Sequence, residues 1–150
     1  MRECDDARDA PPVIVVHALD HAVGALKAAA RRDRPIVLLS APEAGIYVGP
    51  GWFRALAEAA RDAVPEARFS AVLDCGDEAG AALAAIRAGI ECVLFTGRPE
   101  IARRLGDIAR QHNVRLATER PAAGLDLGGD FFFAAPEQIE QHCFALLCRA

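Results

Sequence analysis

An aspartate and a thiol follow one apolar run, and this pair is the part of the sequence best suited to chemistry. Asp74 and Cys75 come at the end of a predicted strand and directly before Gly76. A carboxylate can accept and return a proton, and a thiolate is both a nucleophile and a zinc ligand. A helix that begins just after Cys75 would lower the pKa of its thiol. Ser40 and Thr96 occupy comparable places after two other apolar runs.

The elements that would position these residues alternate between strands and helices. Apolar runs predict strands over residues 13–17, 36–40, 67–74, 92–95 and 114–118. Helical spacing of apolar residues predicts helices over 20–32, 52–63, 77–89 and 99–113, and from 136 onward. Such alternation is typical of a parallel sheet with right-handed crossovers.

The carboxyl ends of parallel strands meet at one edge of the sheet, where α/β proteins bind their ligands. We therefore expect Ser40, Asp74, Cys75 and Thr96 to be candidate ligand-binding residues. Glu119, just after the fifth predicted strand, is a further candidate. Asp74 would be the catalytic residue if the protein is active, and Cys75 would be the metal ligand.

The fold class is α/β, with five parallel strands alternating with helices. Two architectures fit: a partial, truncated TIM-barrel-like sheet, or an open flavodoxin-like sheet. Residues 1–10 are polar and predict a flexible tail, and residues 11–150 predict a single domain. The Gly-rich stretch 120–129 predicts irregular structure, and residues 131–133 predict a short strand or an apolar plug.

A five-stranded fragment of a barrel leaves two unpaired strand edges, and such edges invite pairing. We therefore expect a homodimer, or coverage of one edge by residues 125–150.

Composition narrows the classes of partner and compartment. The formal net charge is −4 and the sequence pI about 5.5, which gives no electrostatic reason to expect a nucleic acid or an anionic membrane. The apolar runs are too short to span a bilayer, and no secretory signal opens the sequence, so we expect a cytoplasmic protein. Five cysteines without a Cys-x-x-Cys pair argue against a disulfide framework. Lys27 is the only lysine and lies within a predicted helix, which argues against Schiff-base chemistry.

A second candidate site lies in the loop over residues 41–51, which is rich in glycine and proline. Tyr47, Trp52 and Phe53 gather in and after this loop, and they predict an interaction surface. His17 and His21 flank the end of the first strand, where we expect a solvated edge.

Several stretches resemble the class II, zinc-dependent fructose-bisphosphate aldolase family. They are His17-Ala-Leu-Asp-His-Ala, Pro35-Ile-Val-Leu-Leu-Ser, Ala44-Gly-Ile-Tyr-Val-Gly, Val72-Leu-Asp-Cys-Gly, Ala88-Gly-Ile-Glu-Cys-Val-Leu-Phe-Thr-Gly and Ala135-Pro-Glu-Gln-Ile. The fourth is similar to the family's His-Leu-Asp-His-Gly, and the third to its Ala-x-x-Tyr-x-Gly loop. The resemblance extends over roughly residues 12–145 and implies a partial β/α barrel.

In that family the aspartate of Asp-His is the acid/base and the adjacent histidine binds zinc. The resemblance gives Asp74 the first role, while Cys75 replaces the histidine. The family's other zinc histidines and its phosphate-binding glycines come from strands six to eight, which have no counterpart in this sequence. No cofactor is therefore expected, although the resemblance would allow zinc.

Two functions follow as hypotheses. The first is a non-catalytic, degenerate aldolase-like protein that acts as a ligand-binding or interaction module. The alternative is a small metal-assisted lyase that uses Asp74 as acid/base.

Overall fold

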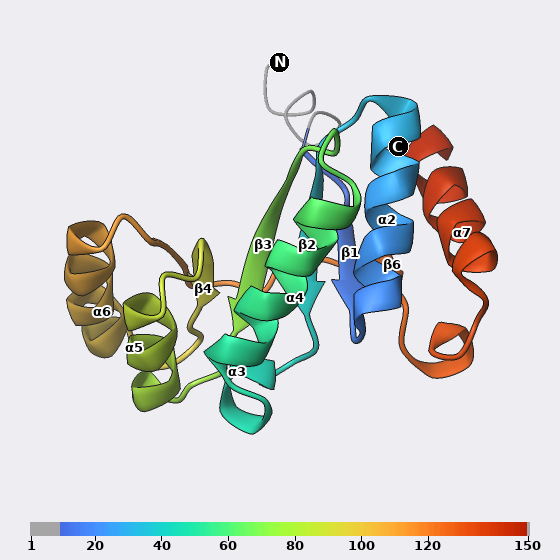
Figure 1. Cartoon of the computed structure of the whole chain (residues 1–150). Helices are drawn as coiled ribbons and strands as arrows, with labels where there is room; N and C mark the ends of the chain where they lie inside the picture. The colour runs from blue at the N-terminus through green and yellow to red at the C-terminus, as the bar shows by residue number, and fades with distance from the viewer. Residues whose placement is uncertain (1–9, 150) are drawn as a thin grey trace, which may run out of the picture.

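Six parallel strands form one sheet in the order β5-β4-β3-β2-β1-β6 (Figure 1). The structure, a computed structural model, describes residues 10–149, so the tail predicted over residues 1–10 lies outside this range except for Ala10. The strands are β1 (Val13–Val16), β2 (Ile36–Ser40), β3 (Phe69–Asp74), β4 (Cys92–Leu94), β5 (Arg115–Ala117) and β6 (Leu125–Asp126).

Helices follow each of the first four strands and the last one. They are α2 (Leu19–Arg32), α3 (Ala44–Tyr47), α4 (Pro50–Ala63), α5 (Ala79–Arg87), α6 (Pro99–Gln111), the 3-10 turn η1 (Gly129–Phe131) and α7 (Pro136–Arg149). The predicted α/β class and its alternation are confirmed.

The helices pack against one face of the sheet. Alternate residues of β1 and β2, such as Ile14 and Leu38, share a core with α2, α4 and α7. On β3 and β4, Leu73 and Val93 share a second core with α3 to α6. A sequential strand order with helices on one face is the arrangement of a partial barrel, whereas a flavodoxin-like sheet has helices on both faces.

The other face of the sheet carries an apolar row that no helix covers. Val15, Leu39, Val72 and Cys92 lie side by side across β1 to β4 and are buried. Together with Leu94 they form a cluster that contains only strand residues among its buried members. Some other part of the chain must therefore exclude water from this face.

The connection from β5 to β6 crosses that face. Residues 118–124, here called the strap, contain no helix and pass behind the sheet on the side opposite the helices (Figure 1). The strap contacts β2 and β3 at their carboxyl ends through Arg120, and the Gly124 N–H donates to the Val13 carbonyl (2.8 Å) at the start of β1. A chain that returns from β5 to the far side of β1 keeps a right-handed crossover only on this face.

The sixth strand corrects the sequence analysis, which expected five. Residues Leu125 and Asp126 pair with Ile14 and Val15 of β1. Two residues carry too little pattern to predict a strand, and here the pairing with β1 creates it. Coverage of one edge by residues 125–150, expected as an alternative to a dimer, is present in the structure.

Residues 131–133 form neither a strand nor an apolar plug. Phe131 ends the turn η1 and is packed in part against the core, whereas Phe132 and Phe133 are exposed. This stretch lies in the connection from β6 to α7, and α7 then packs on α2. No helix among the described residues is long and apolar enough to cross a membrane.

Candidate functional site

Asp74 lies at the carboxyl end of β3 with both carboxylate oxygens engaged. Oδ1 accepts a hydrogen bond from the Gly76 N–H (2.7 Å), and Oδ2 accepts one from Arg120 Nη1 (2.5 Å). The Asp74 N–H donates to Ser40 Oγ (2.9 Å). Asp74 retains only 4% of its exposed area. The predicted neighbours Ser40 and Asp74 are therefore brought together as expected.

Arg120 is the residue of this site that sequence reasoning missed. Besides its bond to Asp74, its Nη2 donates to the Ser40 carbonyl (3.1 Å), so one guanidinium joins the strap to β2 and β3. The Arg120 side chain keeps 28% of its exposure, against 6% for Asp74. A partly buried, charge-assisted pair of this kind is strong, and removing one partner leaves the other desolvated and unpaired.

Cys75 points to the opposite side of the sheet from this ion pair. Its thiol is fully buried in the apolar core beneath α3 and α5. A Cβ on Gly45 of α3 would come within 2.5 Å of the Cys75 Sγ, so α3 rests directly on the thiol. Burial, with a smaller contribution from the Asp74 charge, raises the pKa of Cys75 to about 12. The expectation of a lowered pKa is wrong because desolvation acts against the thiolate.

Thr96 and Glu119 do not join Asp74 through any side-chain bond that the structure gives. Thr96 is exposed, and its N–H donates to the Gly76 carbonyl (2.8 Å), which ties the loop after β4 to the loop after β3. Glu119 is exposed and lines a groove between β5 and α6. Their predicted role in ligand binding stays a prediction.

A second polar cluster lies at the carboxyl end of β1. His17 Nε2 donates to Asp126 Oδ1 (2.6 Å), which also accepts the Gly128 N–H (2.8 Å). Burial raises the pKa of Asp126, but these two hydrogen bonds and the charges of His17 and Arg120 outweigh it and hold the pKa below its ordinary value. His17 and Asp126 are 109 positions apart, so no local sequence pattern could predict their hydrogen bond.

His21 is buried and hydrogen-bonded to two other segments of the chain. The expectation of a solvated edge is therefore wrong for this residue. Its side chain is fully buried. Nδ1 accepts the His17 N–H (3.1 Å), and Nε2 donates to the Phe132 carbonyl (3.0 Å). The ring therefore fastens the connection between β6 and α7 to the start of α2.

The donor set around Asp74 and Cys75 does not fit a zinc centre. A cysteine binds zinc as its thiolate, and the Cys75 thiol lies in an apolar core with a raised pKa. Over residues 10–149 no group of three His, Cys, Asp or Glu side chains could hold a metal ion.

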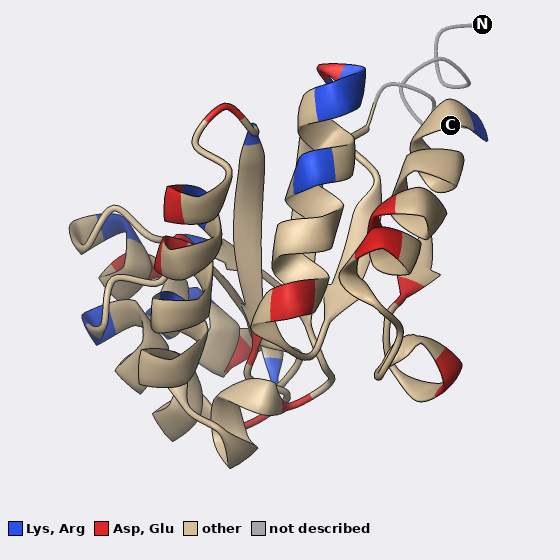
Figure 2. Ribbon diagram, turned by 45° about the vertical axis from the view of Figure 1, so that its right-hand side comes forward, with Lys and Arg blue, Asp and Glu red and all other residues tan. Residues whose placement is uncertain are grey.

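The segment between β2 and α4, together with the start of α4, exposes apolar side chains at the same end of the sheet. Ile46, Tyr47, Val48 and Trp52, here called the apolar patch, are four of the seven exposed large hydrophobic residues of residues 10–149. Tyr47 is the most exposed residue of the apolar patch, at 77%. Residues 44–53 contain no charged side chain, and Figure 2 shows α3 as an uncharged ribbon.

Phe53 does not belong to this surface, which corrects the predicted trio of Tyr47, Trp52 and Phe53. Its side chain is 1% exposed and packs in the core with α5 and β3. Trp52 and Phe53 differ in exposure because they lie on different faces of α4. Phe53 faces the sheet, whereas Trp52 points away from it.

Comparison with known proteins supports the fold. No protein-family model and no curated protein matches this sequence. Among solved structures, the chain is similar to a candidate fructose-1,6-biphosphate aldolase from Coccidioides immitis, with a TM-score of 0.61 and 18% identity. The similarity covers 74% of this chain and 46% of the other, so this chain spans about half of that protein. The scaffold is therefore aldolase-like.

Replacing Arg120 tests the ion pair. Arg120→Met removes the guanidinium while keeping an aliphatic stem, and Asp74 is left buried without its partner. We expect the free energy of unfolding to fall by about 2–3 kcal/mol, measured by urea denaturation. The matched control is Arg110→Met, which breaks an exposed pair with Asp107 and should change stability by less than about 0.5 kcal/mol. Equal effects of the two variants would contradict this assignment.

Alkylation tests the state of Cys75. In the native protein at pH 8 we expect iodoacetamide to label the exposed Cys148 and to leave Cys75 unmodified, as read by peptide mass spectrometry. Both should react in urea. Rapid labelling of native Cys75 would show an accessible thiolate and overturn the environment described above.

Proposed function

We propose that this chain is a non-catalytic relative of the class II aldolases that binds another protein through the apolar patch. The proposal is based on two features at the same end of the sheet. Asp74 is buried and hydrogen-bonded through both carboxylate oxygens, and the apolar patch is exposed. Asp74, the acid/base candidate, has a structural role in this proposal. The apolar patch on α3 and the start of α4 is the surface that binds the partner protein.

The state of Asp74 supports the non-catalytic half of the proposal. A general base must reach a substrate proton with a free lone pair in hydrogen-bonding distance. Here each Asp74 oxygen already accepts one hydrogen bond, from Gly76 and from Arg120, and the residue is only 4% exposed, so its remaining lone pairs are out of reach of a substrate in solution. The alternative, a small metal-assisted lyase that uses Asp74, would require the strap to leave this position first.

The composition of the patch supports the interaction half. Exposed apolar clusters on soluble proteins mark contact sites, and tyrosine and tryptophan are enriched there. The patch stands on α3 and the first turn of α4, which rest on Cys75 and Phe53 of the core. A rigid base of this kind limits the ordering cost of binding. The expected partner is a protein with a complementary apolar groove, and a cytoplasmic location stays part of the proposal.

Photocrosslinking from the patch tests this function. A benzophenone amino acid placed at Tyr47 should crosslink one discrete protein in a lysate of the source cells, and Trp52→Ala in the same chain should abolish that product. The control places the same group at Leu19, which is 42% exposed and outside the patch. An identical set of products from both positions, or a product that is insensitive to Trp52→Ala, would refute the proposal.

A further inference from the structure

The connection between β6 and α7 carries the most exposed large hydrophobic residue of the described part of the chain. Phe133 keeps 94% of its exposed area, and Phe132 beside it keeps 39%. Their rings contact each other edge to face, with 4.9 Å between the ring centroids. Single exposed apolar residues are common, but two adjacent aromatic rings form an apolar surface of the kind that binds a partner.

This connection is fastened to the core on one side of Phe133. The Phe132 carbonyl accepts a hydrogen bond from the buried His21 ring of α2 (3.0 Å). Phe131 packs in part against the core, and its ring lies 4.5 Å from the His142 ring of α7. Phe133 therefore projects from a tethered segment, which limits the ordering cost of binding.

The elements around these two rings carry exposed carboxylates. Asp20 lies in the first turn of α2, Asp130 in η1, and Glu137 in the first turn of α7. All three are exposed, and none has an ion-pair partner among the described residues. We call Phe132, Phe133 and these three carboxylates the acidic aromatic surface.

Basic residues are absent from the sequence segments that build this surface. Residues 11–26 and 121–148 contain no lysine or arginine. Arg120, which precedes the second segment, is bound to Asp74 and Ser40. Figure 2 shows acidic residues in η1 and along α7, and a basic residue only at the end of α7. The local charge is therefore negative.

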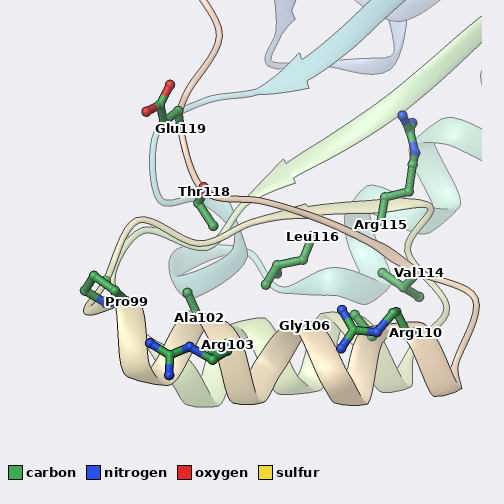
Figure 3. Close-up of a pocket in the computed structure, with 12 residues that line it drawn as sticks. Pro99, Ala102, Arg103, Gly106, Arg110, Val114, Arg115, Leu116, Thr118 and Glu119 are labelled. Atoms are coloured by element: carbon green, nitrogen blue, oxygen red, sulfur yellow. The ribbon is translucent and has the colours of Figure 1, made fainter.

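The opposite edge of the sheet has a different character. A groove of about 850 Å³ lies between β5 and α6, and its lining includes three arginines and one carboxylate (Figure 3): Arg103, Arg110, Arg115 and Glu119. Strands β5 and β6 are the two ends of the strand order. A positively charged partner is therefore favoured at the acidic aromatic surface over this groove.

We propose that the acidic aromatic surface binds a basic amphipathic helix of another protein. Such a helix offers an apolar stripe to Phe132 and Phe133, with lysine or arginine side chains beside the stripe. The unpaired carboxylates attract those cations and speed the encounter. The same carboxylates repel an anionic membrane or a nucleic acid.

This surface is separate from the apolar patch, which lies on α3 and the start of α4 (Figure 1). The inference therefore goes beyond the proposed function, and either proposal can fail alone.

A synthetic peptide tests the proposal on the full chain. The probe is a fluorescein-labelled helix of about 14 leucine and lysine residues, with the leucines at helical spacing. Fluorescence anisotropy should show binding with a Kd below about 50 μM that weakens as salt rises. The same peptide with glutamate in place of lysine should not bind. Phe133→Ser should weaken binding of the lysine peptide by about tenfold.

A pair of charge-matched variants separates local from overall charge. Asp130→Asn/Glu137→Gln should weaken binding of the lysine peptide by about fivefold. The control Asp62→Asn/Glu66→Gln removes the same net charge from exposed positions at the end of α4 and beyond it, and it should leave the affinity unchanged. Equal losses in the two double variants would overturn the proposal.

Trp52 supplies a reporter for the competing location. It is the only tryptophan of the sequence and belongs to the apolar patch, so its fluorescence should not change when the peptide binds. A change would place the peptide on the apolar patch and overturn the proposal. The same conclusion follows from no binding, from equal affinity for both peptides, or from an unchanged affinity in Phe133→Ser. A dimer of the free chain that Phe133→Ser dissociates, measured by light scattering, would make a second copy the occupant instead.

Discussion

The fold depends on how the chain returns from the last strand of the series to the free edge of the first. Five strands follow one another across the sheet with helices on one face, which leaves the opposite face apolar and bare. The strap crosses that face without a helix or a ladder of its own. Its position is fixed by Arg120, which binds Asp74 and Ser40 at one end of the crossing, and by Gly124, which binds Val13 at the other.

The same ion pair links architecture to function. An acid/base carboxylate and a structural carboxylate have opposite requirements, because the first must be accessible to a substrate and the second must be buried with its partners. Asp74 meets the second requirement. The adjacent Cys75 is turned into the apolar core under α3, and α3 and the start of α4 carry the apolar patch. The carboxyl end of the sheet thus carries a buried, ion-paired carboxylate beside an exposed apolar patch.

Local sequence pattern was sufficient to predict most of the strands and helices. It also indicated that Ser40 and Asp74 lie at the carboxyl ends of strands. The apolar runs predicted β1 to β5, and the helical spacing of apolar residues predicted α2, α4, α5 and α6. The short helix α3 was not predicted, because residues 41–51 were expected to form a loop. The contact between Ser40 and Asp74 follows from neighbouring parallel strands, so it could be predicted as well. Phe53 was placed on the wrong side of α4, because adjacent aromatic residues at a helix start do not reveal which one faces the sheet.

What could not be predicted comes from long-range pairing. The partners Arg120 and Asp74 are 46 positions apart, and His17 and Asp126 are 109 apart. Strand β6 has two residues and exists because β1 offers an edge. The pKa of Cys75 moved opposite to expectation because burial by α3, which sequence pattern did not reveal, outweighs any benefit from the helix that follows.

The most direct test of the central claim is a double-mutant cycle on Asp74 and Arg120. The free energies of unfolding of the wild type, Asp74→Ala, Arg120→Met and the double variant would be measured by urea denaturation in one buffer. A structural ion pair predicts a coupling energy of at least about 1 kcal/mol, with the double variant no less stable than Asp74→Ala alone. Additive losses, with a coupling energy near zero, would show that the strap is held by other contacts and that Asp74 is free for another role.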